Sequence, residues 1–215
     1  MEKRILVIAL VIASFAALCF SCSYHAYDNP DDFPVLLSAD GRTVIITCYS
    51  GSKWRDIKVP PLINKKPVTV IGDNAFADAE IADITIPNGI KKIGAWAFSG
   101  NYIVDFKIPD TVTEIDAGAF MCNKLDSITI PRSVKEIGYR AFCENPLKSI
   151  TIGKNVKLNE LSGYDTDLEA EWVYSAFEMG LNVEFDEFYR QNGSKAGTYV
   201  LEDGSWRILS LSGRK

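Results

Sequence analysis

The side chains of this chain that could do chemistry are one histidine, five cysteines and 28 carboxylates among 215 residues. His25 stands in a short polar segment near the start, so a serine or cysteine nucleophile of a folded domain would lack a histidine base. Neither an HExxH zinc motif nor a Gly-rich phosphate-binding loop occurs. Carboxylates such as Asp83 and Asp105 could pair for acid–base work, but on a shallow strand face water solvates both. We therefore predict a protein that is not an enzyme and uses no cofactor.

Metal binding has no sequence support either. The cysteines form no CxxC pair and show no Cys/His spacing typical of zinc. The stretch Leu158–Tyr189 holds nine carboxylates and no Lys or Arg, but its "DTDLEAE" run lacks the glycine and the spacing of a calcium loop. This acidic segment allows three interpretations: a solvated insertion, a docking site for a basic partner, or a cation site.

The start of the chain predicts a signal peptide over residues 1–21. "MEKR" is basic, and the apolar run Ile5–Leu18 has 14 residues, whereas a membrane-spanning helix needs roughly 20. "LCFSCS" resembles the lipobox of bacterial lipoproteins, with a serine directly before Cys22, although Cys19 takes a place that is usually aliphatic. The resemblance implies a lipid on Cys22 and a tether over residues 22–34. An ordinary cleaved signal and an uncleaved anchor are the alternatives.

The elements that would position the remaining side chains belong to a repeat of 22 residues. Phrases such as "VTEIDAGAF" and "VKEIGYRAF" recur with apolar residues at fixed places, as in a solenoid whose coils bury their apolar faces against each other. An "ITI"-like stretch alternates inward and outward residues as a strand does, and "VTEI" forms a second wall. The phenylalanine then plugs the coil. The four full copies are Val68–Gly89, Ile90–Thr111, Val112–Ser133 and Val134–Asn155.

Two further columns of the repeat have a predicted structural role. Glycines follow the "VTEI" stretch and allow a tight turn at Gly72, Gly94 and Gly138. Three places after the phenylalanine stand Asn101, Asn123 and Asn145. We expect these asparagine amides to bond backbone groups of adjacent coils that would otherwise be buried unpaired. Polar turn residues in solvent are the alternative.

The run "LDSITIPRSVKEIGYRAF" closely resembles the BspA-like leucine-rich repeats of bacterial surface proteins, and "FDEFYRQNGSKAGTY" resembles the closing segment of spirochaetal lipoprotein members. The resemblance implies an α/β leucine-rich repeat solenoid, a right-handed superhelix that is mostly β with short helical or 3-10 turns. We expect a parallel concave sheet of about six rungs. Residues 35–67 would form an N-terminal cap and a degenerate first repeat, and residues 68–155 the four full repeats. Residues 156–215 would form a degenerate repeat, the acidic insertion and a cap whose hairpin turns at Asp203–Gly204.

Candidate ligand-binding residues are those that vary between copies on the expected concave face. Their rungs would lie ~4.8 Å apart, and one column would be Thr85–Lys107–Thr129–Thr151, in which Lys107 is the cation. Such side chains form either a binding surface or ordinary solvated strand residues. The candidate set is Asp83, Thr85, Asp105, Lys107, Asp126, Thr129, Lys148 and Thr151.

Three cysteines remain beyond Cys22, and an odd number leaves at least one unpaired or paired outside the chain. Cys122 and Cys143 would lie diagonally on adjacent rungs, with Cα atoms ~6 Å apart, which is within the range of a disulfide. The direction of their side chains does not follow from the sequence, so the sequence leaves this bond open.

Charge and resemblance together suggest a function. The net charge is −5 and no Lys/Arg cluster stands out, which argues against nucleic acid as a partner. The resemblance implies a lipid-anchored protein of the bacterial cell envelope that binds host matrix proteins, other cells or an envelope protein, with no small-molecule substrate. The alternative is a structural or scaffolding lipoprotein that faces the periplasm and binds an endogenous partner.

Overall fold

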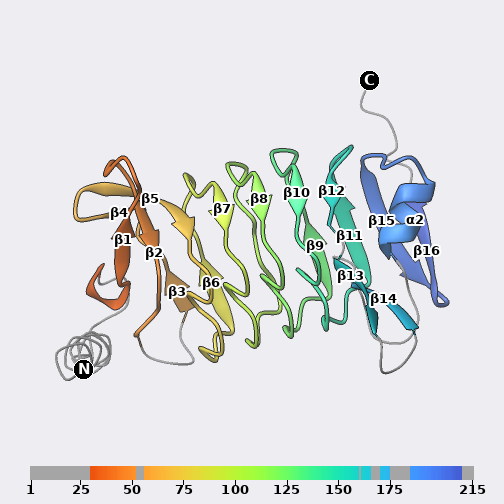
Figure 1. Cartoon of the computed structure of the whole chain (residues 1–215), viewed down its shortest axis with the longest axis horizontal. Helices are drawn as coiled ribbons and strands as arrows, with labels where there is room; N and C mark the ends of the chain where they lie inside the picture. Colours follow the sequence, from red (N-terminus) through yellow and green to blue (C-terminus); the bar gives the residue numbers. More distant parts are fainter. Residues whose placement is uncertain (1–29, 52–55, 160, 166–169, 175–184, 210–215) are drawn as a thin grey trace, which may run out of the picture.

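The protein folds as a solenoid whose coils stack side by side along one long axis (Figure 1). This computed structural model describes residues 30–51, 56–159, 161–165, 170–174 and 185–209. The predicted signal peptide, Cys22 and the tether up to residue 29 lie outside the described residues. Among the described residues, no helix has the length and apolar character needed to cross a bilayer.

The solenoid is built from short strands and little helix, as the repeat predicts. In chain order the elements are η1 (Pro30–Asp32), β1 (Val35–Leu37), β2 (Val44–Ile46), β3 (Asp56–Lys58), β4 (Leu62–Ile63), β5 (Lys66–Ile71), β6 (Asp83–Thr85), β7 (Lys92–Ile93), β8 (Glu114–Ile115), β9 (Ser127–Thr129), β10 (Glu136–Ile137), β11 (Ser149–Ile152), β12 (Lys157–Leu158), β13 (Leu161–Asp165), β14 (Ala170–Tyr174), α2 (Phe185–Gln191), β15 (Gly197–Glu202) and β16 (Ser205–Leu209).

One wall of the solenoid is an eight-stranded sheet, which we call the long sheet. Its order is β1-β2-β5-β7-β8-β10-β12, with β4 paired to β5. From β2 onward the main path is parallel, and its register joins residues one repeat apart, so that Ile71, Ile93, Ile115 and Ile137 follow one another. All four isoleucines are fully buried. The 22-residue spacing in the sequence is therefore the length of one coil.

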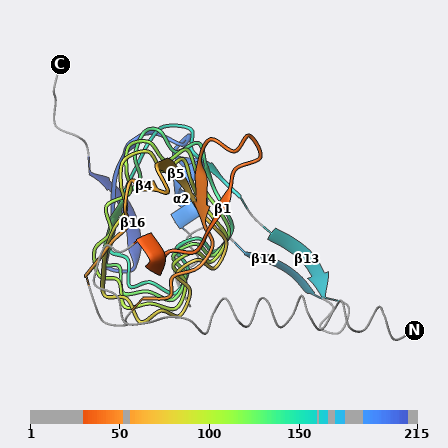
Figure 2. The same ribbon diagram turned by 90° about the vertical axis from the view of Figure 1, so that its left-hand side faces the viewer.

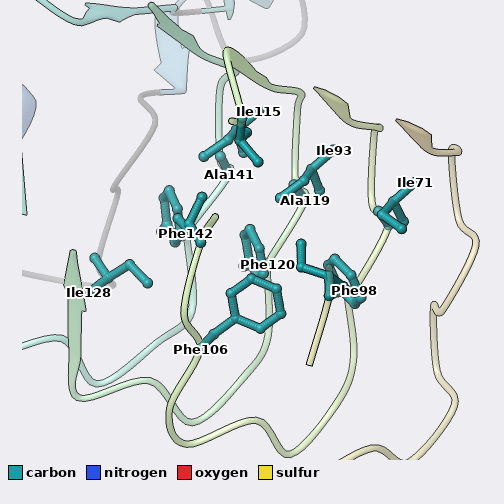
Figure 3. Close-up of a cluster of buried hydrophobic side chains, with 14 of the residues drawn as sticks. Ile71, Ile93, Phe98, Phe106, Ile115, Ala119, Phe120, Ile128, Ala141 and Phe142 are labelled. Carbon is teal, nitrogen blue, oxygen red and sulfur yellow. The ribbon is translucent and has the colours of Figure 1, made fainter. Parts of the chain in front are cut away.

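A stack of phenylalanine rings fills the middle of the coils (Figure 3). The ring centroids of Phe76, Phe98, Phe120 and Phe142 follow one another at 5.2, 5.3 and 5.2 Å. Tyr49 extends the stack toward the N-terminus at 5.5 Å from Phe76. Both faces of each ring are removed from contact with water, so burying the ring contributes on the order of 1.5–3 kcal/mol to stability. This confirms the predicted role of the phenylalanine as the plug of each coil.

The asparagine column forms a buried hydrogen-bond ladder. Asn123 is 1% exposed; its Oδ1 accepts from the Ile103 amide at 3.1 Å, and its Nδ2 donates to Phe98 O at 2.8 Å and to Phe120 O at 3.1 Å. Asn101 and Asn145 repeat the same contacts one coil earlier and one coil later. The expectation that these amides satisfy backbone groups of adjacent coils is confirmed, and the solvent alternative is wrong.

The glycine column has another cause than the predicted tight turn. None of Gly72, Gly94 and Gly138 has a positive φ. A Cβ at Gly138 would instead lie 2.3 Å from the Ala117 amide nitrogen of the preceding coil, and one at Gly72 would lie 2.5 Å from Ile46 O. These glycines are needed because successive coils approach closely there. The left-handed residue comes two places later and is Asn74, Trp96, Gly118 or Arg140.

Both ends of the stack are closed by antiparallel elements. At the N-terminal end β1 pairs with β2, and "PLINKKP" folds into the β4–β5 hairpin. At the C-terminal end β15 pairs antiparallel with β11 and then with β16 through Asp203 and Gly204, whose φ values of 50° and 74° confirm the predicted turn. α2 lies beside β15 and β16 at this end, while β13 and β14 project away from the coils (Figure 2).

Candidate functional site

The predicted concave face is the wall opposite the long sheet. We call it the threonine face and define it as the outward side chains of β3, β6, residues 104–108, β9 and β11. Alternation along each rung is as predicted, since Ile84 and Ile128 are buried while Thr85 and Thr129 are exposed. Register pairs Thr129 with Thr151 and Ser127 with Ser149.

The columns of this face extend into the degenerate first repeat that the sequence predicts within residues 35–67. Asp56 and Lys58 of β3 pair with Asp83 and Thr85 of β6. The insertion that forms the β4–β5 hairpin places this first rung 27 residues upstream instead of 22. At the other end, Thr151 Oγ1 lies 2.8 Å from Thr198 Oγ1 of β15, so this threonine is hydrogen-bonded to the cap.

The rung in the centre of the threonine face, residues 104–108, is not paired as a strand. Tyr102 still donates to Ile81 O at 2.8 Å and Lys124 to Ile103 O at 2.9 Å. Beyond these bonds, none of the backbone hydrogen bonds found among the described residues joins residues 104–108 to either neighbouring rung. The expected sheet of about six rungs is therefore interrupted, and β3–β6 and β9–β11–β15–β16 form separate sheets.

The interior residue of the interrupted rung differs from that of its neighbours. Phe106 stands where β6, β9 and β11 have isoleucine. Its ring is buried, 5.2 Å from Phe98 and edge-on to Phe120 at 4.7 Å (Figure 3). A phenyl ring extends further from the backbone than an isoleucine side chain, so the interrupted rung differs from the paired rungs in the volume of its interior residue.

Two pockets flank the interrupted rung. The first pocket, toward β6, has a volume of about 370 Å³ and is lined by Ala82, Asp83, Ile84, Thr85, Val104, Asp105 and Lys107. The second pocket, toward β9, has a volume of about 410 Å³, and its polar lining comprises Asp105, Lys107, Asp110, Ser127 and Thr129. Five of the eight candidate residues therefore come together around residues 104–108. Asp126, Lys148 and Thr151 line neither pocket.

The charged side chains of these pockets make no internal pairs. Within the described part of the chain, Asp83, Asp105, Lys107 and Asp110 show no side-chain hydrogen bond or ion pair. Beside them stand Val104, which is 57% exposed, and Tyr102, which is 44% exposed. The centre of the threonine face thus combines exposed apolar groups with charges that are available to a partner.

The long sheet presents a different pattern, because the charged side chains of β7, β8, β10 and β12 form ion pairs with one another. Lys92 Nζ lies 2.6 Å from Glu114 and 2.8 Å from Asp116, and Lys157 Nζ lies 3.1 Å from Glu136. The hydrogen bond from Lys92 lowers the pKa of Glu114, whereas burial raises the pKa of Asp116. These residues were not among the candidates; aligning opposite charges at the 22-residue period would have found Lys92 and Glu114.

The two remaining predictions concern cysteines and acidic residues. Cys122 N donates to Cys143 O at 3.0 Å, so the two residues lie on adjacent coils as expected. Cys122 is exposed, Cys143 is buried, and no disulfide joins them in the structure.

In the acidic segment, residues 160, 166–169 and 175–184 lie outside the described residues. Asp186 is buried at the start of α2. Among the described residues, no group of three or more His, Cys, Asp or Glu side chains could hold a metal ion.

Comparison with known proteins agrees with this architecture. The family model of the BspA type leucine rich repeat region, in six copies, matches residues 46–164, from β2 into β13. A leucine-rich repeat protein of T. pallidum is 28% identical over 57% of this chain and 59% of its own, with a TM-score of 0.54. The chain thus spans well under two thirds of that protein.

A leucine-rich repeat protein from Bacteroides capillosus is 27% identical over 55% of this chain and 92% of its own, with a TM-score of 0.49. No curated protein matches the sequence significantly. The matched segment contains the four full repeats and the degenerate rungs on either side, and it covers more than half of the chain. By this match, the protein belongs to the BspA type leucine-rich repeat family.

Proposed function

We propose that this protein is a non-catalytic, lipid-anchored protein of the bacterial cell envelope that binds another protein through its threonine face. Leucine-rich repeat domains generally mediate protein–protein interactions. The observation that carries the choice of face is a contrast between the two walls. Lys92, Glu114 and Asp116 on the long sheet form ion pairs within the chain, whereas the charged side chains around residues 104–108 form none among the described residues and line two open pockets.

The size of the face limits how it can bind. Roughly six rungs at ~4.8 Å give a strip ~25 Å long. Because the strip is also narrow, its area is smaller than the ~800 Å² that each partner buries in a standard interface. A tight complex must therefore include a neighbouring surface such as the C-terminal cap, whose strands β15 and β16 continue the sheet of β9 and β11. Otherwise many anchored copies bind together, each weakly.

A pair of photo-crosslinking variants tests the face directly. A benzophenone amino acid at Thr129 places the probe on the threonine face, and the same residue at Thr113 places it on the long sheet of the same coil. Both threonines are exposed. We expect intact cells to give a discrete crosslinked band from Thr129 and none from Thr113. Crosslinks from Thr113 alone, or equally from both, would show that the face is assigned wrongly.

The proposed anchor is tested separately at Cys22. Stable membrane attachment of a lipoprotein takes more than one acyl chain, each contributing ~0.8 kcal/mol per buried CH₂. Cys22→Ser should therefore move the protein into the aqueous phase on detergent partitioning, while Cys19→Ser should not. Protease added to intact cells then distinguishes the two orientations. Digestion indicates an adhesion role at the surface, and protection indicates a scaffold that faces the periplasm.

A further inference from the structure

The interruption at residues 104–108 exposes backbone groups that the other rungs use for pairing. Successive amides of an extended strand point to opposite edges. Ile130 donates toward the following coil, to Thr151 O, and Val59 donates to Thr85 O. By the same alternation, Asp105 and Lys107 direct their N–H and C=O groups into the first pocket.

The residues between and after these two direct their backbone groups to the other side of the rung. Phe106 and Ile108 direct their backbone groups into the second pocket, and Ile84 and Thr129 border the two pockets from the far sides. Each pocket is therefore lined along its length by backbone donors and acceptors without ladder partners in the described structure.

The side chains around these backbone groups select for positive charge. Asp83, Asp105 and Asp110 carry three negative charges around the two pockets, and Lys107 carries one positive charge. The first pocket also contains Val104, more than half of which is exposed. Such a lining is complementary to a long side chain that has an apolar stem and a cationic end.

Arginine matches this lining better than lysine. A guanidinium group offers five N–H donors in one plane, and it can bond a carboxylate and carbonyl oxygens at the same time. An ammonium group is more strongly hydrated and lacks this planar arrangement. The open carbonyl groups beside Asp83 and Asp105 supply the additional acceptors that make the difference.

We infer that the partner of the threonine face inserts an arginine side chain into the pocket between β6 and residues 104–108, and that Phe106 holds this pocket open. The inference rests on the proposed function and names the chemistry of its partner. Phe106 acts as a positioning residue, because it is buried and does not touch the inserted side chain. Lys107 remains available at the rim for a carboxylate of the same partner.

The test uses backbone amide NMR of the full chain in detergent micelles, with the blocked peptide acetyl-Gly-Arg-Gly-amide as the probe. We expect saturable shifts at the amides of Asp105 and Lys107. The matched peptide with lysine in place of arginine should bind at least threefold more weakly, and the peptide with glutamate should cause no shift. No shift with the arginine peptide, or equal affinity for arginine and lysine, would overturn the inference.

Two variants separate the pocket from general negative charge. Asp105→Asn should weaken arginine-peptide binding at least threefold, whereas Asp126→Asn, which removes an exposed carboxylate outside both pockets, should not. Equal effects of both would indicate nonspecific attraction and contradict the inference.

A third variant, Phe106→Ile, restores the residue type of the neighbouring rungs. It should slow hydrogen exchange at the amides of Asp105 and Lys107 at least tenfold, because the ladder closes, and it should abolish the peptide shifts. Retained binding in a closed ladder would contradict the role of Phe106. If this variant does not fold, the two Asp→Asn variants still decide. Crosslinking from Thr129 with no arginine binding would leave the proposed function standing and remove this inference alone.

Discussion

The hydroxyl of Tyr189 donates to Gly153 O at 2.7 Å and accepts from the Val156 amide at 3.2 Å. Tyr189 belongs to α2 of the cap, while Gly153 and Val156 belong to the last coil. One buried side chain thus bonds both a donor and an acceptor at the place where the regular repeat ends. The ring also contacts Phe185 and Tyr199, with centroids 5.9 and 5.7 Å away.

Removing this hydroxyl should weaken the attachment of the cap. Tyr189→Phe keeps the ring but leaves Gly153 O and the Val156 amide unpaired in a buried place. We expect the free energy of unfolding in urea to fall by about 1–3 kcal/mol. Tyr139→Phe, at a half-buried tyrosine whose hydroxyl makes no hydrogen bond among the described residues, is the matched control and should change it by less than about 0.5 kcal/mol. Equal stability of wild type and Tyr189→Phe would mean that the cap is not held by this bond.

The asparagine ladder should also be sensitive to a single truncation. Asn123→Ala removes the partner of the buried Ile103 amide, whereas Phe98 O keeps its bond from Asn101 and Phe120 O keeps its bond from Asn145. One unpaired buried donor costs about 1–3 kcal/mol. The change should be visible as a large drop of the urea midpoint with an unchanged slope. Asn88→Ala, in an exposed turn, serves as the control and should be close to neutral.

Two alanine substitutions test whether the glycines of the repeat are needed because adjacent coils approach closely or because the chain turns there. At Gly138 a Cβ would meet backbone atoms of residues 116 and 117 at 2.3–2.8 Å, so Gly138→Ala must push two coils apart. We expect a loss of at least about 2 kcal/mol, typical of strong overpacking. At Gly153 the nearest atoms lie 3.6 and 3.7 Å from the same Cβ position, so Gly153→Ala should be tolerated. Circular dichroism melts of both variants make the comparison.

Burial raises the pKa of Tyr199 to about 12, and the charge of Tyr189 adds to the effect. Because the pKa of Tyr199 in the folded protein lies above the ordinary tyrosine value of 10.0, the unfolded chain loses its proton first as pH rises. Stability is therefore fully present below pH ~10 and decreases between ~10 and ~12, by at most ~2.7 kcal/mol from this residue. Urea unfolding from pH 8 to 11.5 should show the decrease. Tyr199→Phe should flatten it, and a decrease of the same size in that variant would refute the assignment.

Lys107 carries the prediction about binding. Once the partner is known from crosslinking, Lys107→Glu should weaken its binding by about 1–3 kcal/mol, because a carboxylate placed opposite Lys107 then meets a like charge. The melting temperature should stay nearly constant, since the side chain is exposed and unpaired among the described residues. Lys148→Glu, on the same face but outside both pockets, is the control. If deletion of Glu160–Glu171 abolishes binding while Lys107→Glu leaves it intact, recognition lies in the acidic segment instead.

The sequence predicts the inside and outside of the repeat because burial follows its period. Ile128 and Thr129 differ in type, and the structure places them on opposite sides of the wall. The asparagine ladder was predictable for the same reason, since a polar residue at a fixed place among apolar ones requires a backbone partner. The glycines were misinterpreted because a close approach involves an atom one coil away, which local turn chemistry does not reveal.

The interruption of the threonine face was not predictable in this way. Phe106 fits the apolar pattern as well as isoleucine does. What distinguishes it is how its larger ring packs against Phe98 and Phe120, which the pattern does not give. The 22-residue period is enough to align Lys92 with Glu114, whereas the second ion pair of Lys92, with Asp116, depends on side-chain placement that the period does not give. The closing strand β15 lies outside the repeats, so the 22-residue period could not predict that it pairs antiparallel with β11.

The missing ladder bonds also bear on the mechanics of the molecule. In a repeat protein the coupling between neighbouring coils is a sum of separate contributions. The coil that contains residues 104–108 keeps its long-sheet bonds, its asparagine bonds and its ring contacts, but it lacks the backbone bonds of one wall on both sides. We therefore expect the solenoid to bend most easily at this coil. Such bending would change the width of the two pockets more than it changes the contacts within the coils on either side.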